Sequence, residues 1–206
     1  MELEKIKEIE GRAVYLTEDN INTDQTAPTD EALYVLSWPE LADVFLILER
    51  KDEQGVLKQD HILNNPAYDG ARILFVRKNF NCGSSREHAA QATKARYDAV
   101  VGESFAPIFE DNAYAIGLPV VKTDEQGVDL LIKAARENPQ TQFRLNLECR
   151  TISWDNGLVR VEMDENRRKG FLEGIWDERK ALVSNMRSVH RLAAASPYVQ
   201  RYTNLM

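Results

Sequence analysis

The feature that most restricts the fold of this chain is a pair of short apolar runs separated by a stretch of helical character. Residues 72–76 read RILFV, residues 99–101 read AVV, and good helix formers dominate residues 85–97 between them. Short runs of this kind are typical of strands that are buried on both faces. A strand, a helix and a second strand in this order make a crossover between parallel strands. The chain is therefore predicted to be an α/β protein.

Periodicity and turn residues extend this reading in both directions along the chain. Toward the N-terminus they predict a strand at residues 11–16, a loop at 17–30 and a helix at 40–51. Beyond the crossover they predict helices at residues 103–116, 124–137 and 166–185, a third parallel strand at 118–121, and strands at 142–154 and 158–163. The last two strands flank Asp155-Asn156-Gly157, a strong hairpin signal. The tail from residue 187 shows no clear period. The sequence thus predicts a parallel sheet portion, an antiparallel portion and flanking helices.

Charge and cysteine content exclude several classes of function. The formal net charge of −7 argues against a nucleic-acid partner, because neutralising phosphates requires a basic surface. No stretch approaches the roughly 20 apolar residues of a membrane span, and the charged first residues do not resemble a signal peptide, so we expect no membrane partner and a cytoplasmic location. Cys82 and Cys149 are too few for a disulfide framework, or to hold zinc or an iron–sulfur cluster unaided.

The loop after the first crossover strand gathers polar side chains. Residues 79–90 read NFNCGSSREHAA. Because the loop follows a predicted strand and opens a helix, backbone N–H groups and the positive end of the helix dipole should face any ligand above the strand ends. Between residues 71 and 97, one acid, Glu87, accompanies six basic residues: Arg72, Arg77, Lys78, Arg86, Lys94 and Arg96. The loop is therefore predicted to bind an anion.

Each residue of this loop also has a purely structural interpretation. Ser84 or Ser85 could cap the helix, because serine is a favoured capping residue. Cys82 could be a small buried apolar residue, and His88 a structural hydrogen-bonding group. Asp24, in the run NINTDQ, could simply form a local turn. Only the combination of these residues points to chemistry.

That combination resembles the signature of the swivelling domain of the aconitase superfamily, in which a Gly-Ser-Ser-Arg-Glu-His-Ala run follows an Asn and an aromatic residue. The resemblance extends to residues 11–16 and the run NINTDQ near the start, to NNPAYDGARILFVRKNF before the motif and to ESFAPIFEDNAYAIGLPVV after it. Together these stretches are similar to the small-subunit family of bacterial 3-isopropylmalate dehydratases, the isomerases of the leucine pathway. The match weakens from about residue 167. Residues 1–206 are therefore expected to form a single swivelling domain with a C-terminal helical extension.

The resemblance implies roles for the residues of the loop. Ser84 matches the family's general base, which removes the proton from the carbon next to a substrate carboxylate. Ser85 and Arg86 match substrate-binding positions, and the planar fork of the arginine suits a carboxylate. A serine hydroxyl is a poor base in water, so N–H donors and a neighbouring guanidinium are needed to support its alkoxide. A supporting part is expected for four further residues: Asp24, Gly83, Glu87 and His88.

The resemblance also implies a cofactor and a partner. Family members use a 4Fe-4S cluster as a Lewis acid, and in the two-subunit enzymes this cluster sits in the large subunit. This chain is therefore expected to bind no metal itself, to take a small dicarboxylate substrate, and to be active only with a cluster-bearing large subunit. The expected reaction is that of a hydro-lyase, which interconverts 2-isopropylmalate and 3-isopropylmalate by dehydration and rehydration.

One loop departs from the family pattern. Thr26 and Ala27 stand where two aliphatic residues are usual, and Asp30 and Glu31 add negative charge. The resemblance makes residues 26–33 the expected lining of the pocket for the substrate side chain, with Thr26 and Ala27 binding substrate. A sister dehydratase acting on another alkylmalate or on a citrate-like acid is therefore an alternative.

Two further alternatives use the same loop differently. A thiol enzyme would employ Cys82 and His88, because a helix N-terminus lowers the pKa of a nearby thiol. A non-catalytic module would bind phosphate through the backbone of the loop alone. The absence of a Walker Gly-Lys-Ser/Thr pattern weakens the phosphate interpretation.

Overall fold

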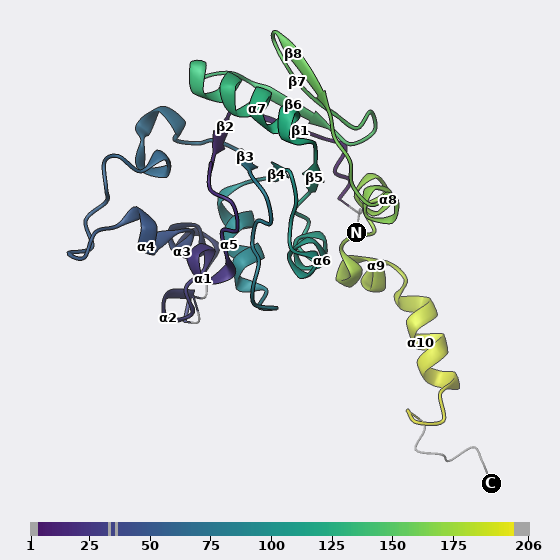
Figure 1. The fold of residues 1–206 in the computed structure, drawn as a ribbon. Helices are drawn as coiled ribbons and strands as arrows, with labels where there is room; N and C mark the ends of the chain where they lie inside the picture. Colours follow the sequence, from purple (N-terminus) through teal and green to yellow (C-terminus); the bar gives the residue numbers. More distant parts are fainter. Residues whose placement is uncertain (1–3, 33, 36, 200–206) are drawn as a thin grey trace.

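The structure is a computed structural model, and it describes all of the chain except residues 1–3, 33, 36 and 200–206. Two four-stranded sheets form its centre (Figure 1). The parallel sheet has the order β2 (Ala13–Tyr15), β3 (Ile73–Val76), β4 (Ala99–Gly102) and β5 (Val120–Lys122). The antiparallel sheet has the order β1 (Glu8–Gly11), β6 (Phe143–Asn146), β7 (Thr151–Trp154) and β8 (Gly157–Arg160). The predicted combination of a parallel and an antiparallel portion is confirmed.

Helices cover both faces of the parallel sheet. The helices, including two short 3-10 turns, are α1 (Thr23–Thr26), α2 (Thr29–Ala32), α3 (Trp38–Val44), α4 (Ile47–Arg50), η1 (Ile62–Asn64), η2 (Pro66–Tyr68), α5 (His88–Arg96), α6 (Pro107–Ala115), α7 (Glu125–Glu137), α8 (Glu165–Glu173), α9 (Glu178–Ser184) and α10 (Met186–Ala195). Helix α7 packs on β2 and β3, and it lies with the antiparallel sheet on one side, whereas α5 and α6 lie on the other (Figure 1). The two consecutive crossovers through α5 and α6 explain why these helices share a face.

The core lies where the two sheets meet. Every residue of β3 is fully buried, which fits a strand covered on both faces. Phe75 of β3 packs edge-on against Phe143 of β6, with ring centroids 5.0 Å apart, and Phe143 in turn contacts Trp154 of β7 at 5.8 Å. Edge-to-face packing of this kind is favoured by the charge distribution of aromatic rings. These rings hold the antiparallel sheet on the parallel one.

Several element boundaries differ from the sequence prediction, and a local backbone feature marks most of them. The predicted helix at residues 40–51 is two helices, because Leu46 adopts a left-handed conformation with φ +53°. The strand predicted at 142–154 is divided into β6 and β7 by a turn in which Arg150 has φ +55°. Gly174, with φ +81°, interrupts the helix predicted at 166–185. The hairpin around Asp155-Asn156-Gly157 is confirmed between β7 and β8.

Three further segments were misjudged from their composition. The predicted loop at residues 17–30 contains α1 and the start of α2, the residues before 11, for which no element was predicted, contain most of β1, and the tail without a clear period contains α10. The C-terminal arm, defined here as residues 178–199, leaves the body near α6 and α8, and α10 extends away from it (Figure 1). None of the residues of α10 is buried. Among the described residues, no helix combines the length and apolar character that a bilayer crossing needs.

Candidate active site

The candidate site lies at the carboxyl edge of the parallel sheet, where the loops after β2, β3 and β4 meet. Pairing between neighbouring chain segments continues beyond the strands, through parallel bridges that join Asn22 to Cys82 and Phe80 to Phe105. Ligands of open α/β sheets bind outside the carboxyl ends of the strands. The predicted motif, residues 79–90, therefore lies at the edge where the fold class places binding sites.

Three residues with left-handed backbone shape the loop before Ser84. Asn79, Asn81 and Gly83 have φ values of +54°, +57° and +109°, and asparagine and glycine are the residues that adopt this region most readily. The side chain of Asn81 is buried, accepts a hydrogen bond from the hydroxyl of Thr26 and donates one to the hydroxyl of Thr93 at 3.5 Å. These contacts fix the loop to α1 on one side and to α5 on the other.

Ser84 lies in this loop and not at the start of a helix. Helix α5 begins at His88, and its capping position is occupied by Glu87, whose side chain makes no capping hydrogen bond. The predicted helix start at residues 84–85 is therefore wrong. The Oγ of Ser84 instead accepts hydrogen bonds from two nitrogens of Arg86: the backbone N at 3.2 Å and Nε at 3.0 Å. The loop brings one hydroxyl oxygen and two N–H donors together without help from the helix dipole.

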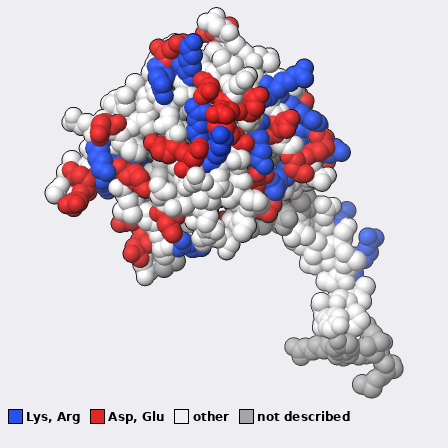
Figure 2. All heavy atoms as spheres, viewed as in Figure 1, with Lys and Arg blue, Asp and Glu red and all other residues white. Residues whose placement is uncertain are grey.

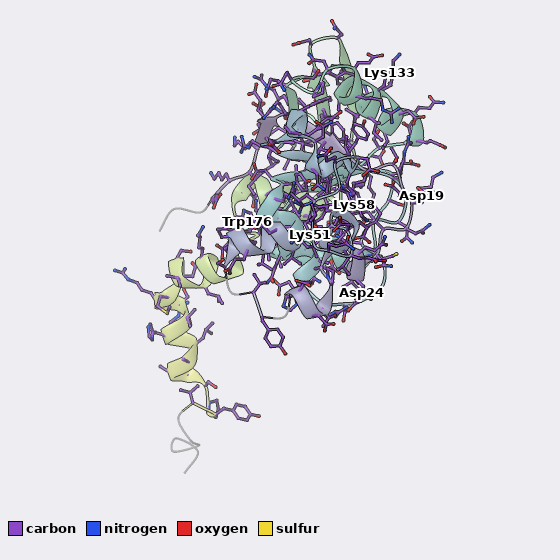
Figure 3. All side chains as sticks on the ribbon, turned by 90° about the vertical axis from the view of Figure 1, so that its left-hand side faces the viewer. Asp19, Asp24, Lys51, Lys58, Lys133 and Trp176 are labelled. Carbon is purple, nitrogen blue, oxygen red and sulfur yellow. The ribbon has the colours of Figure 1, made fainter. Side chains whose placement is uncertain are left out.

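The guanidinium of Arg86 is held at all of its nitrogens. Nε donates to Ser84, Nη1 donates to the hydroxyl of Thr29, and Nη2 pairs with the carboxylate of Asp24. The arginine side chain is 37% exposed, so it remains accessible from the surface. Asp24 lies at the lower end of the body, as Figure 3 shows. The arrangement positions a charged fork directly beside the Ser84 hydroxyl.

The other predicted site residues fall into two groups. Ser85 and Glu87 are exposed, and the carbonyl of Ser85 accepts a hydrogen bond from Asn112 of α6 at 3.3 Å. Ala27 and His88 line a small hollow together with Arg86, and Thr29 and Ala32 complete its lining. Thr26 differs from both groups.

Thr26 is fully buried and cannot touch a substrate in this structure. Its hydroxyl contacts the carbonyls of Asn22 and Thr23 at 3.3 Å each, and it also bonds to Asn81. The residue therefore supports the loop from beneath, contrary to its predicted place in a substrate pocket. Of the predicted pocket at residues 26–33, position 33 lies outside the described residues.

Sequence reasoning missed Thr23, and it placed Thr29 in the predicted pocket at residues 26–33 without its bond to the arginine. Thr29 binds the guanidinium of Arg86, and the Oγ1 of Thr23 accepts a hydrogen bond from the backbone N of Ser84 at 3.0 Å. Thr23 stands next to Asp24 in the run NINTDQ, so the adjacency of a hydroxyl and a carboxylate was the available signal.

Most of the basic residues between positions 71 and 97 interact with groups other than Ser84. Burial opposes the charge of Arg77, but hydrogen bonds to Asp129 and Glu103 outweigh it and raise the pKa. Burial lowers the pKa of Lys94. Further contacts join Arg72 to Asp98 at 2.5 Å, Lys78 to Glu103 at 3.5 Å and Arg96 to the carbonyl of Leu63 at 3.1 Å. Of the six basic residues, Arg86 is the one that bonds to Ser84.

The thiol hypothesis finds little support in the geometry. Cys82 is half-buried, and its Sγ donates to the carbonyl of Asn20 at 3.5 Å rather than to His88. Within the part of the chain that the structure describes, no three His, Cys, Asp or Glu side chains gather into a group able to hold a metal ion.

Comparison with known proteins agrees with the fold and the motif. Residues 4–126 match the family model of the aconitase C-terminal domain. The 3-isopropylmalate dehydratase small subunit of Thermus thermophilus is 37% identical over 200 residues, covering 97% of this chain and 98% of its own length. The small subunit from Synechocystis is 30% identical over 203 residues, covering 98% and 99%.

A solved structure supports the fold independently. The crystal structure of a 3-isopropylmalate dehydratase from Methanocaldococcus jannaschii superimposes with a TM-score of 0.60 at 22% identity, covering 87% of this chain and 99% of its own. At this identity the likeness establishes the aconitase-like fold alone. Family membership rests on the full-length relatives and the family model, which confirm the resemblance carried by the motif. The chain belongs to the family of 3-isopropylmalate dehydratase small subunits, built on the aconitase C-terminal domain.

Proposed function

We propose that this chain is the small subunit of a hydro-lyase that interconverts 2-isopropylmalate and 3-isopropylmalate in leucine biosynthesis. The names of its full-length relatives support the reaction class and the substrate. The observation that carries the proposal is the Ser84 hydroxyl, whose oxygen receives two N–H donors from Arg86 at the carboxyl edge of the sheet. Such donors stabilise negative charge on an oxygen, which is what a serine base requires.

Ser84 acts as the general base in this proposal. As an alkoxide, its Oγ takes the proton from the carbon next to a substrate carboxylate, and the electron pair of the C–H bond forms a double bond while the hydroxyl leaves the neighbouring carbon. Re-addition of the proton and the hydroxide to the opposite carbons of the double bond gives the isomer. The N–H groups of Arg86 that point at Oγ hold the charge of the alkoxide between turnovers.

Arg86 also receives one substrate carboxylate. Its Nη atoms bond to Thr29 and Asp24, both of which lie at the surface. A carboxylate of the substrate replaces one of these partners, because the planar fork matches two carboxylate oxygens. Ser85 is exposed beside the arginine and supplies a further hydroxyl for substrate binding. Thr29, which is exposed and lines the hollow next to Arg86, faces the substrate side chain, and Ala27, only 4% exposed, lines the same hollow.

The proposed enzyme is completed by a large subunit that carries a 4Fe-4S cluster. The relatives are named as small subunits, which implies a larger partner. The two cysteines of this chain lie after different strands, Cys82 in the loop after β3 and Cys149 after β6, so they suit a subunit that leaves cluster binding to its partner. The cluster supplies a Lewis acid for the departing hydroxyl and a carboxylate. The exposed edge that carries Ser85 and Asp24 is the surface that the large subunit covers.

The proposal is tested by reconstitution. The chain and its cognate large subunit are co-purified without oxygen, and isomerisation of 2-isopropylmalate is compared with that of other 2-hydroxy diacids. Activity with 2-isopropylmalate in the complex, and none from either subunit alone, is the expected result. If the complex prefers a different alkylmalate or a citrate-like acid, the proposed substrate is wrong and the proposed reaction class stands. Dehydration by this chain alone would overturn the need for a partner.

A further inference from the structure

The structure shows a double attachment around Gly83, the residue before the proposed base. The backbone N of Thr23 donates to the carbonyl of Cys82 at 2.9 Å, and the Oγ1 of the same threonine accepts from the backbone N of Ser84 at 3.0 Å. Thr23 therefore bonds to the backbone on both sides of Gly83. Gly83 itself has φ +109°, a conformation that glycine adopts readily, and it lies between β3 and α5, outside both elements.

We propose that Thr23 is a positioning residue, whose hydroxyl fixes the backbone of Ser84 so that its Oγ stays under the two N–H donors of Arg86. The proposal rests on the function proposed above and adds a residue to it. Thr23 bonds to the backbone N of Ser84 and not to its Oγ, so it acts through the position of the serine. A displaced serine would lose the two donors at 3.2 Å and 3.0 Å together, because both come from Arg86.

We call Thr23, with its bonds to Cys82 and Ser84, the clamp. Thr23 is itself held firmly. It is only 4% exposed and begins α1, whose N-terminus carries a capping box. In that box the side chain of Asn22 accepts from the backbone N of Gln25, and the side chain of Gln25 accepts from the backbone N of Asn22, each at 2.9 Å. The carbonyl of Thr23 accepts from the backbone N of Ala27 at 2.9 Å. A four-residue helix is thus fastened at both ends.

The space around Gly83 shows how closely the clamp fits. A Cβ placed on Gly83 would lie 3.3 Å from the Oγ1 of Thr23, which is tighter than ordinary van der Waals contact. The threonine hydroxyl therefore occupies the room that the glycine leaves. Asp24, the next residue, pairs with the guanidinium of Arg86. Helix α1 in this way holds the serine through its first residue and the arginine through its second.

The clamp is tested with three variants of this chain in complex with the large subunit. Thr23→Val keeps the branched shape and removes the acceptor for the Ser84 N–H, Thr23→Ser keeps the hydroxyl and removes the methyl, and Thr141→Val changes a buried threonine in the loop after α7. We expect Thr23→Val to lower kcat by about tenfold to a hundredfold, the scale of a displaced catalytic group, with KM within about threefold of the parent. Thr23→Ser and Thr141→Val should both retain kcat within about threefold.

A second measurement does not depend on activity. Amide hydrogen exchange at Ser84 in the isolated full-length chain should be at least about tenfold faster in Thr23→Val than in the parent or Thr23→Ser, because the amide loses its acceptor. Equal exchange rates in all three proteins, or kcat preserved in Thr23→Val, would overturn the clamp. A loss in Thr23→Ser as large as in Thr23→Val would also overturn it, since packing would then explain both. An inactive parent complex with faster exchange in Thr23→Val would instead count against the proposed function and leave the clamp standing.

Discussion

At the scale of single residues, the site is arranged to stabilise negative charge on one oxygen, the Oγ of Ser84. The hydroxyl of Ser84 has a guanidinium and a backbone N–H as donors, and the guanidinium is oriented by Thr29 and Asp24. An alkoxide forms only where donors of this kind are already in place, because water would otherwise have to reorganise around it. The two functions of Arg86, supporting the base and receiving a carboxylate, therefore depend on its neighbours in α1 and α2.

Replacing Ser84 with alanine should strongly lower turnover without weakening the fold. We expect kcat of the complex to fall on the order of 10²-fold or more, as for other positioned proton-transfer groups. The melting temperature should stay close to that of the parent, because Ser84 is not the cap of α5 and the residue is only half-buried. Steady-state kinetics and calorimetry of the same preparation make both measurements. Turnover within a few-fold of the parent, with the large subunit bound and its cluster intact, would remove Ser84 from the mechanism.

His61 should make stability depend on pH below neutrality. Burial, followed by the nearby charge of Arg50, lowers its pKa from the ordinary value of 6.5, and its Nδ1 accepts from the backbone N of Leu63 at 3.2 Å. The unfolded chain therefore binds a proton more readily than the folded chain, and stability should fall as the pH drops below about 6.5. Urea unfolding between pH 7.5 and 5.5 should show a smaller fall in His61→Asn, which still caps the turn. An NMR titration midpoint of His61 at or above 6.5 in the parent would contradict the lowered pKa.

At the scale of elements, the sequence predicted the strands and turns that local patterns specify. It missed the elements that depend on contacts between distant residues. The buried strand β3 and the hairpin between β7 and β8 follow from apolar runs and from the turn Asp155-Asn156-Gly157, which are local signals. Strand β1 reads EIEG and is a strand only because β6 pairs with it. Helix α1 is likewise too short to be stable alone and exists through its capping box and its contact with the Ser84 loop.

The same distinction applies to the candidate site. The motif at residues 79–90 identified Ser84 and Arg86 as neighbours, because they are two residues apart. It could not show that Thr23 reaches the Ser84 backbone from 61 residues away, nor that Thr26 turns inward to meet Asn81. Contacts of this kind are set by how α1 packs, which no local pattern encodes.

Gly174 offers a test of how helix ends are specified. It closes α8 in the left-handed conformation at φ +81°, with its own N and that of Ile175 both donating to the carbonyl of Gly170 at 2.9 Å. Gly174→Ala should lower the free energy of unfolding by about 1–2 kcal/mol, the cost of forcing a Cβ into this conformation. Calorimetry should show Gly174→Asn losing less, because asparagine tolerates the left-handed region better. Equal losses in both variants would indicate a packing effect instead.

At the scale of the whole molecule, a packed body carries the protruding C-terminal arm, residues 178–199. Charged side chains of both signs cover the body in the view of Figure 2, whereas the arm is largely uncharged there apart from a few basic groups. Trp176 lies at the root of the arm (Figure 3), is only 9% exposed and donates from Nε1 to the carbonyl of Glu4 at 2.8 Å. Large apolar side chains of the arm that are exposed include Leu182, Val183, Met186, Leu192, Tyr198 and Val199.

Shortening the chain should show how far the stability of the body depends on the arm. A protein ending at residue 185 loses α10, none of whose residues is buried, so its melting temperature should stay within about 2–4 °C of the parent, the range of a change near 1 kcal/mol. A protein ending at residue 174 also loses Trp176 and its bond to Glu4, and should melt distinctly lower. Calorimetry of the three proteins makes the comparison. A large drop already in the first truncation would show that α10 supports the fold.

The pairing of β1 with β6 has a consequence for synthesis on the ribosome. Glu10 in β1 and Arg144 in β6 are 134 residues apart. At translation rates of about 5–20 residues per second, the first strand waits roughly 7–27 s for its partner to be made. The carbonyl of Phe171, which receives the backbone N of Ile6, emerges later still. The parallel sheet can assemble during this interval, since β2 to β5 end at Lys122. The start of the chain is therefore among the last parts of the molecule to find its place.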